Sequence, residues 1–140
     1  MTDLIKFKHK TTVTVRFNEV DMLNVCNNSV YLVYFDEARF KYIKDVGFMP
    51  EAGWFSDRRL FFIVRNEINY FGHARFDDEL IVYTRIASIR DSSLTFEHVI
   101  ENAKTKKIIA DGLGVLVHVD PKTRKSSSFP DMYYDIIRNT

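Results

Sequence analysis

The sequence is poor in the residues that build disulfides and metal sites. Cys26 is the only cysteine among 140 residues, which excludes an internal disulfide and a zinc site made of several cysteines. The four histidines are scattered and never stand at the i, i+4 spacing of a helical metal pair. We therefore expect no metal and no redox cofactor, and a reducing, cytoplasmic location.

The sequence also lacks an excess of charge of one sign and a long apolar run. Lys and Arg number 20 against 19 Asp and Glu, which leaves no net field to draw the chain onto a nucleic acid. Residues 1–10, MTDLIKFKHK, carry charges throughout and cannot form the apolar region of a signal peptide. No stretch approaches the roughly 20 apolar residues that a spanning helix needs. We expect neither a nucleic-acid partner nor a membrane span.

The composition is sufficient for one packed core. Hydrophobic residues make up 46% of the chain and aromatic residues 14%, which is more than a disordered protein carries. A length of 140 residues is close to the commonest size of a single domain. We expect residues 1–140 to form one domain.

Residues 11–18, TTVTVRFN, show the alternation of a half-buried strand. Val13, Val15 and Phe17 fall on one face, and polar residues fall on the other. The pattern predicts the first strand, with these three apolar side chains buried.

A long helix is predicted from Ser29 to Val46, where the chain has no Gly or Pro and apolar residues recur at helical spacing. Asn27 or Asn28 is the candidate N-cap, and Gly47 and Pro50 are stop signals. Further apolar positions widen the stripe, namely Val30, Val33, Phe40 and Ile43. We therefore expect the helix to be buried over much of its circumference.

Four strands are predicted after the helix, at about 61–71, 79–89, 93–101 and 107–119. Their short connections indicate an antiparallel meander. In the last strand Gly112 and Gly114 share one face, which permits close approach of a helix or ligand. Residues 131–138 are a candidate terminal helix. One strand, one buried helix and four strands describe an α+β hot-dog fold, in which a five-stranded antiparallel sheet wraps around one long central helix.

A carboxylate and a helix start come close together in residues 21–39, DMLNVCNNSVYLVYFDEAR. The helix start offers backbone N–H groups and a positive dipole end to the oxyanion that forms during thioester hydrolysis. Asp21, just after the first strand, can orient or deprotonate water, or attack the carbonyl itself. This arrangement is suited to acyl transfer.

The same segment resembles the Asp-x-x-Gly-x-x-x-x-x-x-Tyr signature and the following helix of hydroxybenzoyl-CoA thioesterase-like hot-dog proteins. The matching residues are Asp21, Tyr31, Tyr34, Phe35, Glu37, Ala38 and Arg39. Further matches are Arg65–Tyr70 (RNEINY), Asp77 and Asp78, Ser92–Phe96 (SSLTF), and Val117–Asp120 (VHVD), so the resemblance spans nearly the whole chain. The chain departs from the pattern at Asn24, which replaces Gly, and at Val25 and Cys26, where some relatives carry a polar residue.

The resemblance implies a thioesterase that converts a small or medium acyl-CoA to a free acid and CoA. It implies that Asp21 is the catalytic carboxylate, as base or nucleophile, and that the backbone amide nearest Asn28 polarises the thioester carbonyl. It also implies a site at a subunit interface. Because long edge strands expose pairing groups, we expect a homodimer or homotetramer.

Other side chains are weaker candidates. Tyr31 and Tyr34 are expected to line the core or the acyl pocket. The remaining candidates for substrate binding are Arg90, Ser92, Ser93, Lys122, Arg124 and Lys125, of which the cations would neutralise CoA phosphates. Cys26 is expected to be a small buried hydrophobe rather than a nucleophile. Glu37 ranks second to Asp21 because it stands near Arg39 and is expected to form ion pairs.

Three alternative functions remain open. The acyl group could be carried by an acyl-carrier protein, which would dock on a basic surface instead of in a nucleotide pocket. A non-catalytic acyl-binding module would fit the residues Asn24 and Val25. A hot-dog hydratase ranks last, because it needs a carboxylate working with a nearby His and no such pair follows the first strand.

Overall fold

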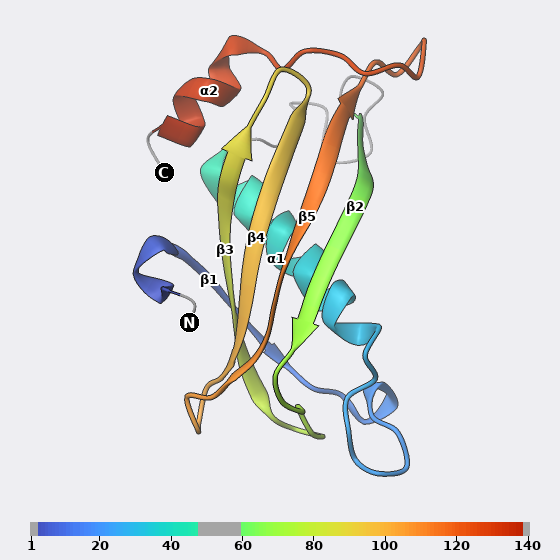
Figure 1. Cartoon of the computed structure of the whole chain (residues 1–140), viewed down its shortest axis with the longest axis vertical. Helices are drawn as coiled ribbons and strands as arrows, with labels where there is room; N and C mark the ends of the chain where they lie inside the picture. The colour runs from blue at the N-terminus through green and yellow to red at the C-terminus, as the bar shows by residue number, and fades with distance from the viewer. Residues whose placement is uncertain (1–2, 48–59, 139–140) are drawn as a thin grey trace.

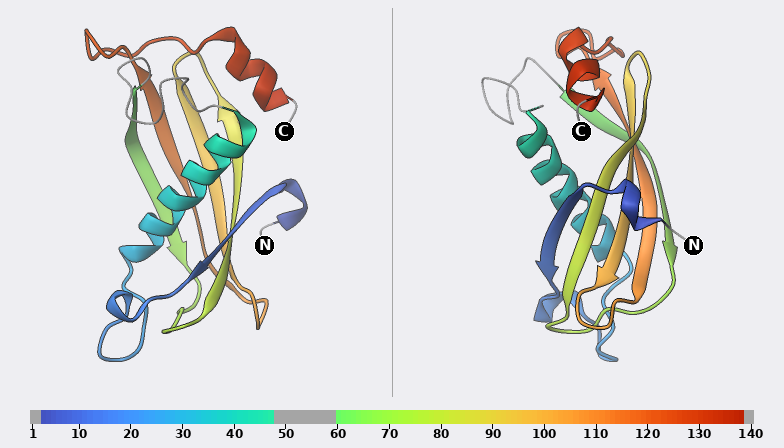
Figure 2. Two further views of the ribbon diagram at one scale, coloured as in Figure 1. Left: turned by 180° about the vertical axis from the view of Figure 1, so that it is seen from behind. Right: turned by 90° about the vertical axis from the view of Figure 1, so that its left-hand side faces the viewer.

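The computed structural model describes residues 3–47 and 60–138, which form an antiparallel sheet with a long helix lying on it (Figure 1). The strands are β1 (His9–Thr14), β2 (Leu60–Tyr70), β3 (Glu79–Ile89), β4 (Ser93–Asn102) and β5 (Ile108–Val119). They are hydrogen-bonded in the order β1-β3-β4-β5-β2. Helix α1 (Val30–Val46) crosses one face of the sheet, and α2 (Asp131–Arg138) lies at one end (Figure 2). Two 3-10 turns, η1 (Leu4–Lys6) and η2 (Phe17–Glu19), flank β1.

The predicted order of elements along the chain is confirmed, but the predicted four-strand meander is wrong for β2. This strand pairs with β5 and not with β3, so only β3, β4 and β5 form a meander. The four C-terminal strands begin and end within one residue of their predicted bounds, and α2 covers residues 131–138 as predicted. Helix α1 ends at Gly47, whose φ of 92° is left-handed and whose N–H donates to the carbonyl of Ile43. Pro50, the second predicted stop signal, lies outside the described residues.

The first strand ends at Thr14 and not at residue 18. Val15 is 1% exposed as predicted, but Phe17 is 77% exposed, so its predicted burial is wrong. The backbone stops being extended at η2, where Oε1 of Glu19 accepts the backbone N–H of Arg16 at 2.8 Å. The alternation of residue types continues past the point where the chain turns. Phe17 therefore lies outside the core.

Helix α1 is buried on one side only. The face toward the sheet carries its buried residues, which are Tyr31, Tyr34, Phe35, Ala38, Arg39, Tyr42 and Ile43. Val33 is 56% exposed and Phe40 is 43% exposed, so the predicted burial over much of the circumference is wrong for the single chain. The sheet covers one side of the helix, and these two residues lie on the other side. No helix within residues 3–47 and 60–138 is long and apolar enough to cross a membrane.

Strand β5 has no side chain where α1 comes closest. A Cβ at position 112 would collide with the backbone oxygen of Glu67 and lie 2.9 Å from Cε2 of Phe35. A Cβ at position 114 would lie 2.9 Å from Nη1 of Arg39. Gly112 and Gly114 therefore allow the close approach that the sequence predicted.

Arg39 carries a charge from α1 into the interior. It is 4% exposed and pairs with Asp36, one turn earlier. Its Nη1 lies 3.4 Å from Nε2 of His98, whose ring stacks on Phe35 with centroids 4.6 Å apart. Burial, and then the charge of Arg39, lower the pKa of His98 well below its usual value, so the ring is neutral. Because Arg can only donate, Nε2 accepts, and Nδ1–H donates to Oγ1 of Thr84 at 3.0 Å.

We predict that Gly112→Ala lowers the free energy of unfolding by about 1–3 kcal/mol, because the added methyl group overpacks the contact between the sheet and α1. Gly72→Ala is the matched control, since its Cβ would meet only Cδ1 of Ile109 at 3.6 Å, an ordinary contact. Urea denaturation measures both changes. Equal midpoints for the two variants would contradict the proposed packing role of residue 112.

Candidate active site

The loop between η2 and α1 forms a closed turn that carries Asp21. Val20 and Cys26 form an antiparallel bridge across it, and the N–H of Asn27 donates to the carbonyl of Glu19 at 2.9 Å. The N–H of Cys26 also donates to the carbonyl of Ala74 at 2.8 Å. These backbone bonds fix both ends of the turn, and Asp21, next to the bridge, also donates its N–H to the carbonyl of Val25 at 3.0 Å.

Asp21 has one oxygen held by the loop and one without a protein partner. Oδ1 accepts the backbone N–H of Leu23 at 2.8 Å and that of Val25 at 3.2 Å. No residue in the described part of the chain donates to Oδ2, and the side chain is exposed. Asp21 is therefore a turn former through one oxygen, while the other is available to water or substrate.

Asn24 stands where the family signature has Gly, and its backbone explains the exchange. Its φ is 58°, in the left-handed region that Gly adopts freely and Asn tolerates better than most residues. Oδ1 of Asn24 accepts the backbone N–H of Phe76 at 2.9 Å, and its carbonyl accepts Nη1 of Arg75 at 3.3 Å. Asn24 thus keeps the turn of the signature and adds a link to the segment before β3.

We predict that Asn24→Ala lowers the free energy of unfolding by about 2–3 kcal/mol, from left-handed strain and the lost bond to Phe76. Asn24→Gly, which loses only the side chain bond, should cost about 1 kcal/mol. Urea denaturation compares the two variants. The explanation fails if Ala and Gly are equally destabilising.

The start of α1 leaves one backbone N–H unused. Oδ1 of Asn27 accepts the backbone N–H and the hydroxyl of Ser29 at 3.1 and 2.9 Å, and its carbonyl accepts the N–H of Val30. The N-cap residue of α1 is Ser29, so neither predicted candidate holds that position, although Asn27 bonds to the helix start through its side chain. The carbonyl of Asn28 accepts the hydroxyl of Tyr70 at 3.0 Å. Among the described residues, no turn, loop or side-chain bond uses the N–H of Asn28.

Tyr31 and Tyr34 form hydrogen bonds to the segments that flank the loop carrying Asp21. Tyr31 is 1% exposed, and its hydroxyl accepts the backbone N–H of Ala74 at 3.1 Å. Tyr34 is 3% exposed and donates to Oε1 of Glu19 at 3.0 Å. Burial raises the pKa of Tyr31 to about 12 and also raises the pKa of Tyr34. Both hydroxyls stay protonated and engaged in the framework, and contact with substrate stays a prediction for these two residues.

The surroundings of Cys26 and Glu37 indicate structural roles for both residues. Cys26 is 1% exposed, its Sγ lies 3.9 Å from the hydroxyl of Tyr34, and burial raises the pKa of the thiol. A buried, protonated thiol is a poor nucleophile. Glu37 is exposed on α1 and lies 3.7 Å from Nζ of Lys41, so its ion pair is with Lys41 and not with Arg39.

The other predicted substrate-binding residues lie far from Asp21 in the same chain. They are Arg90, Ser92 and Ser93, in and beside the turn between β3 and β4, and Lys122, Arg124 and Lys125, between β5 and α2. These two segments meet at one end of the sheet, and the loop before α1 lies at the other end (Figure 1). One chain therefore does not bring the two groups together.

Three supporting residues were not anticipated as parts of the site. Glu19 holds both the N–H of Arg16 and the hydroxyl of Tyr34 through Oε1. Tyr70 lies in the matched RNEINY segment, but nothing in the sequence indicated that its hydroxyl reaches the helix start. Nothing in the sequence indicated the hydrogen bond between the side chain of Asn24 and Phe76 either. No group of three or more His, Cys, Asp or Glu in residues 3–47 and 60–138 is arranged to hold a metal ion.

Comparison with known proteins places the chain in a family. Residues 15–137 match the model of the thioesterase-like superfamily. The chain is 28% identical over 118 residues to the acyl-CoA thioester hydrolase YbgC of Escherichia coli O6:H1, covering 84% of this chain and 87% of that protein.

Solved structures agree with this family. A thioesterase complexed with coenzyme A and Zn from Thermus thermophilus is 30% identical, with a TM-score of 0.80 over 94% of this chain and 98% of that one. The 1,4-dihydroxy-2-naphthoyl-CoA thioesterase Slr0204 from Synechocystis shares the fold, with a TM-score of 0.84 at 17% identity over 93% and 95% of the two chains. The chain therefore belongs to the thioesterase-like superfamily and is a thioester hydrolase with the predicted hot-dog fold.

Proposed function

We propose that the chain hydrolyses acyl-CoA thioesters to a free carboxylic acid and CoA, with Asp21 at the reaction centre. One observation carries this proposal: in the described part of the chain, a single loop contains both a carboxylate oxygen without a protein partner, Oδ2 of Asp21, and a backbone N–H without an acceptor, that of Asn28. The name of the relative YbgC supports acyl-CoA as the substrate class. The bound coenzyme A of the Thermus thermophilus thioesterase supports it as well.

In the proposed reaction, a water molecule held by Oδ2 of Asp21 attacks the thioester carbonyl carbon and gives a proton to the carboxylate. The N–H of Asn28 and the positive end of the α1 dipole stabilise the charge on the carbonyl oxygen. The carbon–sulfur bond then breaks, and the proton passes to the CoA sulfur. Direct attack by Asp21 would form a mixed anhydride first and give the same products after hydrolysis.

We predict that Asp21→Asn lowers kcat by about 100-fold or more, the scale of a lost general base or nucleophile. The amide oxygen can still accept the N–H groups of Leu23 and Val25, so the loop keeps its shape. Thiol release from a panel of short, medium, long and aromatic acyl-CoAs measures the rate. Asp77→Asn is the control, because Asp77 is an exposed acid with a φ of 67°, which Asn tolerates.

The same panel separates the competing functions. Inhibition by free CoA is expected for a CoA site, and the lack of inhibition would point to an acyl-carrier protein as the acyl donor. Acyl-CoA binding without turnover by either protein would contradict hydrolysis and favour an acyl-binding module. Equal rates for wild type and Asp21→Asn would remove Asp21 from the reaction centre.

The proposed site is shared between two copies of the chain. Arg90, Lys122 and Arg124 can join Asp21 in one site only if a second copy supplies them, since they lie at the far end of the sheet. The edge strand β2 offers a surface for this association, because within residues 3–47 and 60–138 it pairs only with β5, and it is 11 residues long. Phe62 is 46% exposed and Val64 is 62% exposed along it. Long apolar edges of this kind favour pairing with another chain.

We predict that Val64→Lys converts the oligomer to a monomer and lowers thioester hydrolysis at the same time, because a charge on the edge strand opposes pairing. Ile5→Lys is the control, since Ile5 is 90% exposed in η1, away from β2. Sedimentation velocity at micromolar concentration gives the mass, and thiol release gives the rate. A wild-type monomer, or an active Val64→Lys monomer, would refute the shared site.

A further inference from the structure

A cavity lies at the opposite end of α1 from Asp21. Its volume is about 330 Å³, within the usual size range of small-molecule sites. It is lined by Lys6, Lys8, His9, Tyr42, Val46, Thr84, Arg85, Ile86 and Ile137. At about 1.5 Å per residue, Val46 lies roughly 22 Å along the helix axis from Tyr31. The cavity is therefore separate from the loop that carries Asp21.

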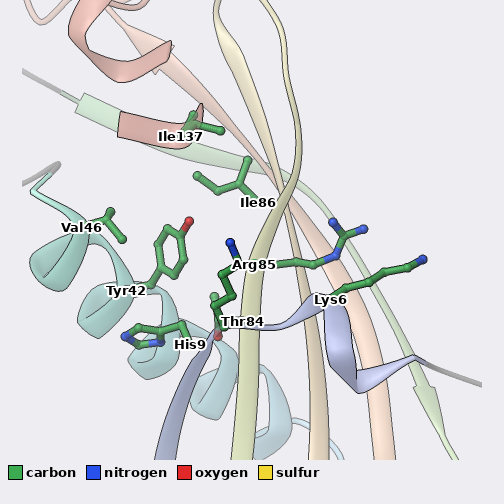
Figure 3. Close-up of a pocket in the computed structure, with 9 residues that line it drawn as sticks. Lys6, His9, Tyr42, Val46, Thr84, Arg85, Ile86 and Ile137 are labelled. Carbon is green, nitrogen blue, oxygen red and sulfur yellow. The ribbon is translucent and has the colours of Figure 1, made fainter. Parts of the chain in front are cut away.

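The lining divides into an apolar side and a cationic side. Tyr42 and Val46 of α1 face Ile86 of β3 and Ile137 of α2 on one side of β3 (Figure 3). Lys6 and Arg85 extend side by side in the other direction (Figure 3). Such a lining matches a ligand with an apolar body and an anionic head.

The charges beside the cavity are only partly neutralised by the protein. Within residues 3–47 and 60–138, neither Lys6 nor Lys8 forms an ion pair. Arg85 donates through Nε to Oε1 of Glu97 at 2.7 Å. The lysines carry charges that an anion can pair with, and the guanidinium of Arg85 has further N–H donors.

His9 adds an unsatisfied group to the same lining. Its Nε2 lies 2.8 Å from Oδ2 of Asp45, and its ring packs edge-on against Tyr42 with centroids 5.3 Å apart. Its Nδ1 is buried and has no hydrogen-bond partner in the described part of the chain. Because the carboxylate of Asp45 only accepts, Nε2 of the neutral ring carries the hydrogen and Nδ1 is an acceptor. A water molecule in the cavity can donate both to Nδ1 and to the carboxylate of a ligand.

We propose that this cavity binds a small monocarboxylate with an apolar body, such as a medium-chain fatty acid. At roughly 30 Å³ per atom, the volume that a water molecule takes in the liquid, the cavity has room for about ten non-hydrogen atoms. The chain of the acid lies on Tyr42, Val46, Ile86 and Ile137, and its carboxylate meets the lysines. This site does not depend on the proposed hydrolysis, because it needs neither Asp21 nor Asn28.

Titration of the full chain with octanoate, followed by methyl NMR, tests the proposal. We expect shifts at the methyl groups of Val46, Ile86 and Ile137, and a much weaker response to octanol, which has the same chain without the charge. Shifts confined to Leu23 and Val25 would show binding at the reaction centre instead. That result, an equal response to octanol, or no shifts at all would overturn the proposal without bearing on thioester hydrolysis.

The double variant Lys6→Ala/Lys8→Ala tests the cationic side. We expect its dissociation constant for octanoate to rise at least tenfold, as about two partly exposed ion pairs are lost. Lys104→Ala/Lys107→Ala, two exposed lysines at the turn between β4 and β5, is the control and should bind like wild type. Unchanged affinity in the first variant, with an unchanged melting temperature, would overturn the assignment. Binding of inorganic phosphate at the same methyl groups, as tight as octanoate, would also overturn it.

Discussion

The close approach of the Phe35 and Arg39 side chains of α1 to the glycines of β5 is the constraint on which the rest of the structure depends. Because β5 presents no Cβ at positions 112 and 114, the helix can lie low enough for Phe35 and Arg39 to reach His98 on β4. A helix held further out would leave the guanidinium of Arg39 without its inner partner, and a buried charge without partners is costly. The distance between α1 and the sheet also sets the position of the first turn of the helix relative to β2. The hydroxyl of Tyr70 on β2 can then hold the carbonyl of Asn28.

The loop that carries Asp21 is hydrogen-bonded to one short segment of the chain. The N–H of Cys26 and the hydroxyl of Tyr31 both bond to Ala74, and Asn24 bonds to Phe76. Residues 72–78 come directly before β3, so they are anchored to an inner strand at one end of the sheet. Chemical groups on loops are effective when a rigid framework holds them, and this segment provides that framework. Asp21 thus keeps a fixed orientation although its carboxylate is exposed.

The elements and the position of Asp21 close to the helix start could be predicted from the sequence because their signals are local. Periodicity gives the bounds of β3 and α2, and the spacing of Asp21 to the helix start lies within one short segment. The bonds from Asn24 to Phe76 and from Tyr70 to Asn28 join residues 52 and 42 positions apart, which no local pattern reports. Alternation also misplaced Phe17, since it gives the side of a strand but not the residue at which the strand ends.

The sequence also could not predict at which end of the sheet each candidate residue lies. Arg90 and Lys122 are candidates by residue type and by their position in turns, and both lie in turns in the structure. Their distance from Asp21 follows from the antiparallel order of the strands, which decides the end at which each turn stands. The exposed Val33 and Phe40 of α1 follow from the same geometry, because a single sheet covers one side of a helix.

The two edges of the sheet differ, and this limits the size that an assembly can reach. The edge at β1 is 6 residues long and carries Lys10 in the strand and Lys8 beside it, whereas the edge at β2 is 11 residues long and begins with the apolar run Leu60–Val64. A lysine-bearing, short edge resists addition of another strand. In the proposed dimer, each copy would pair with the other through β2, which would leave no further long edge exposed. Such a dimer would be closed and finite, and its sheet would not grow into a fibre.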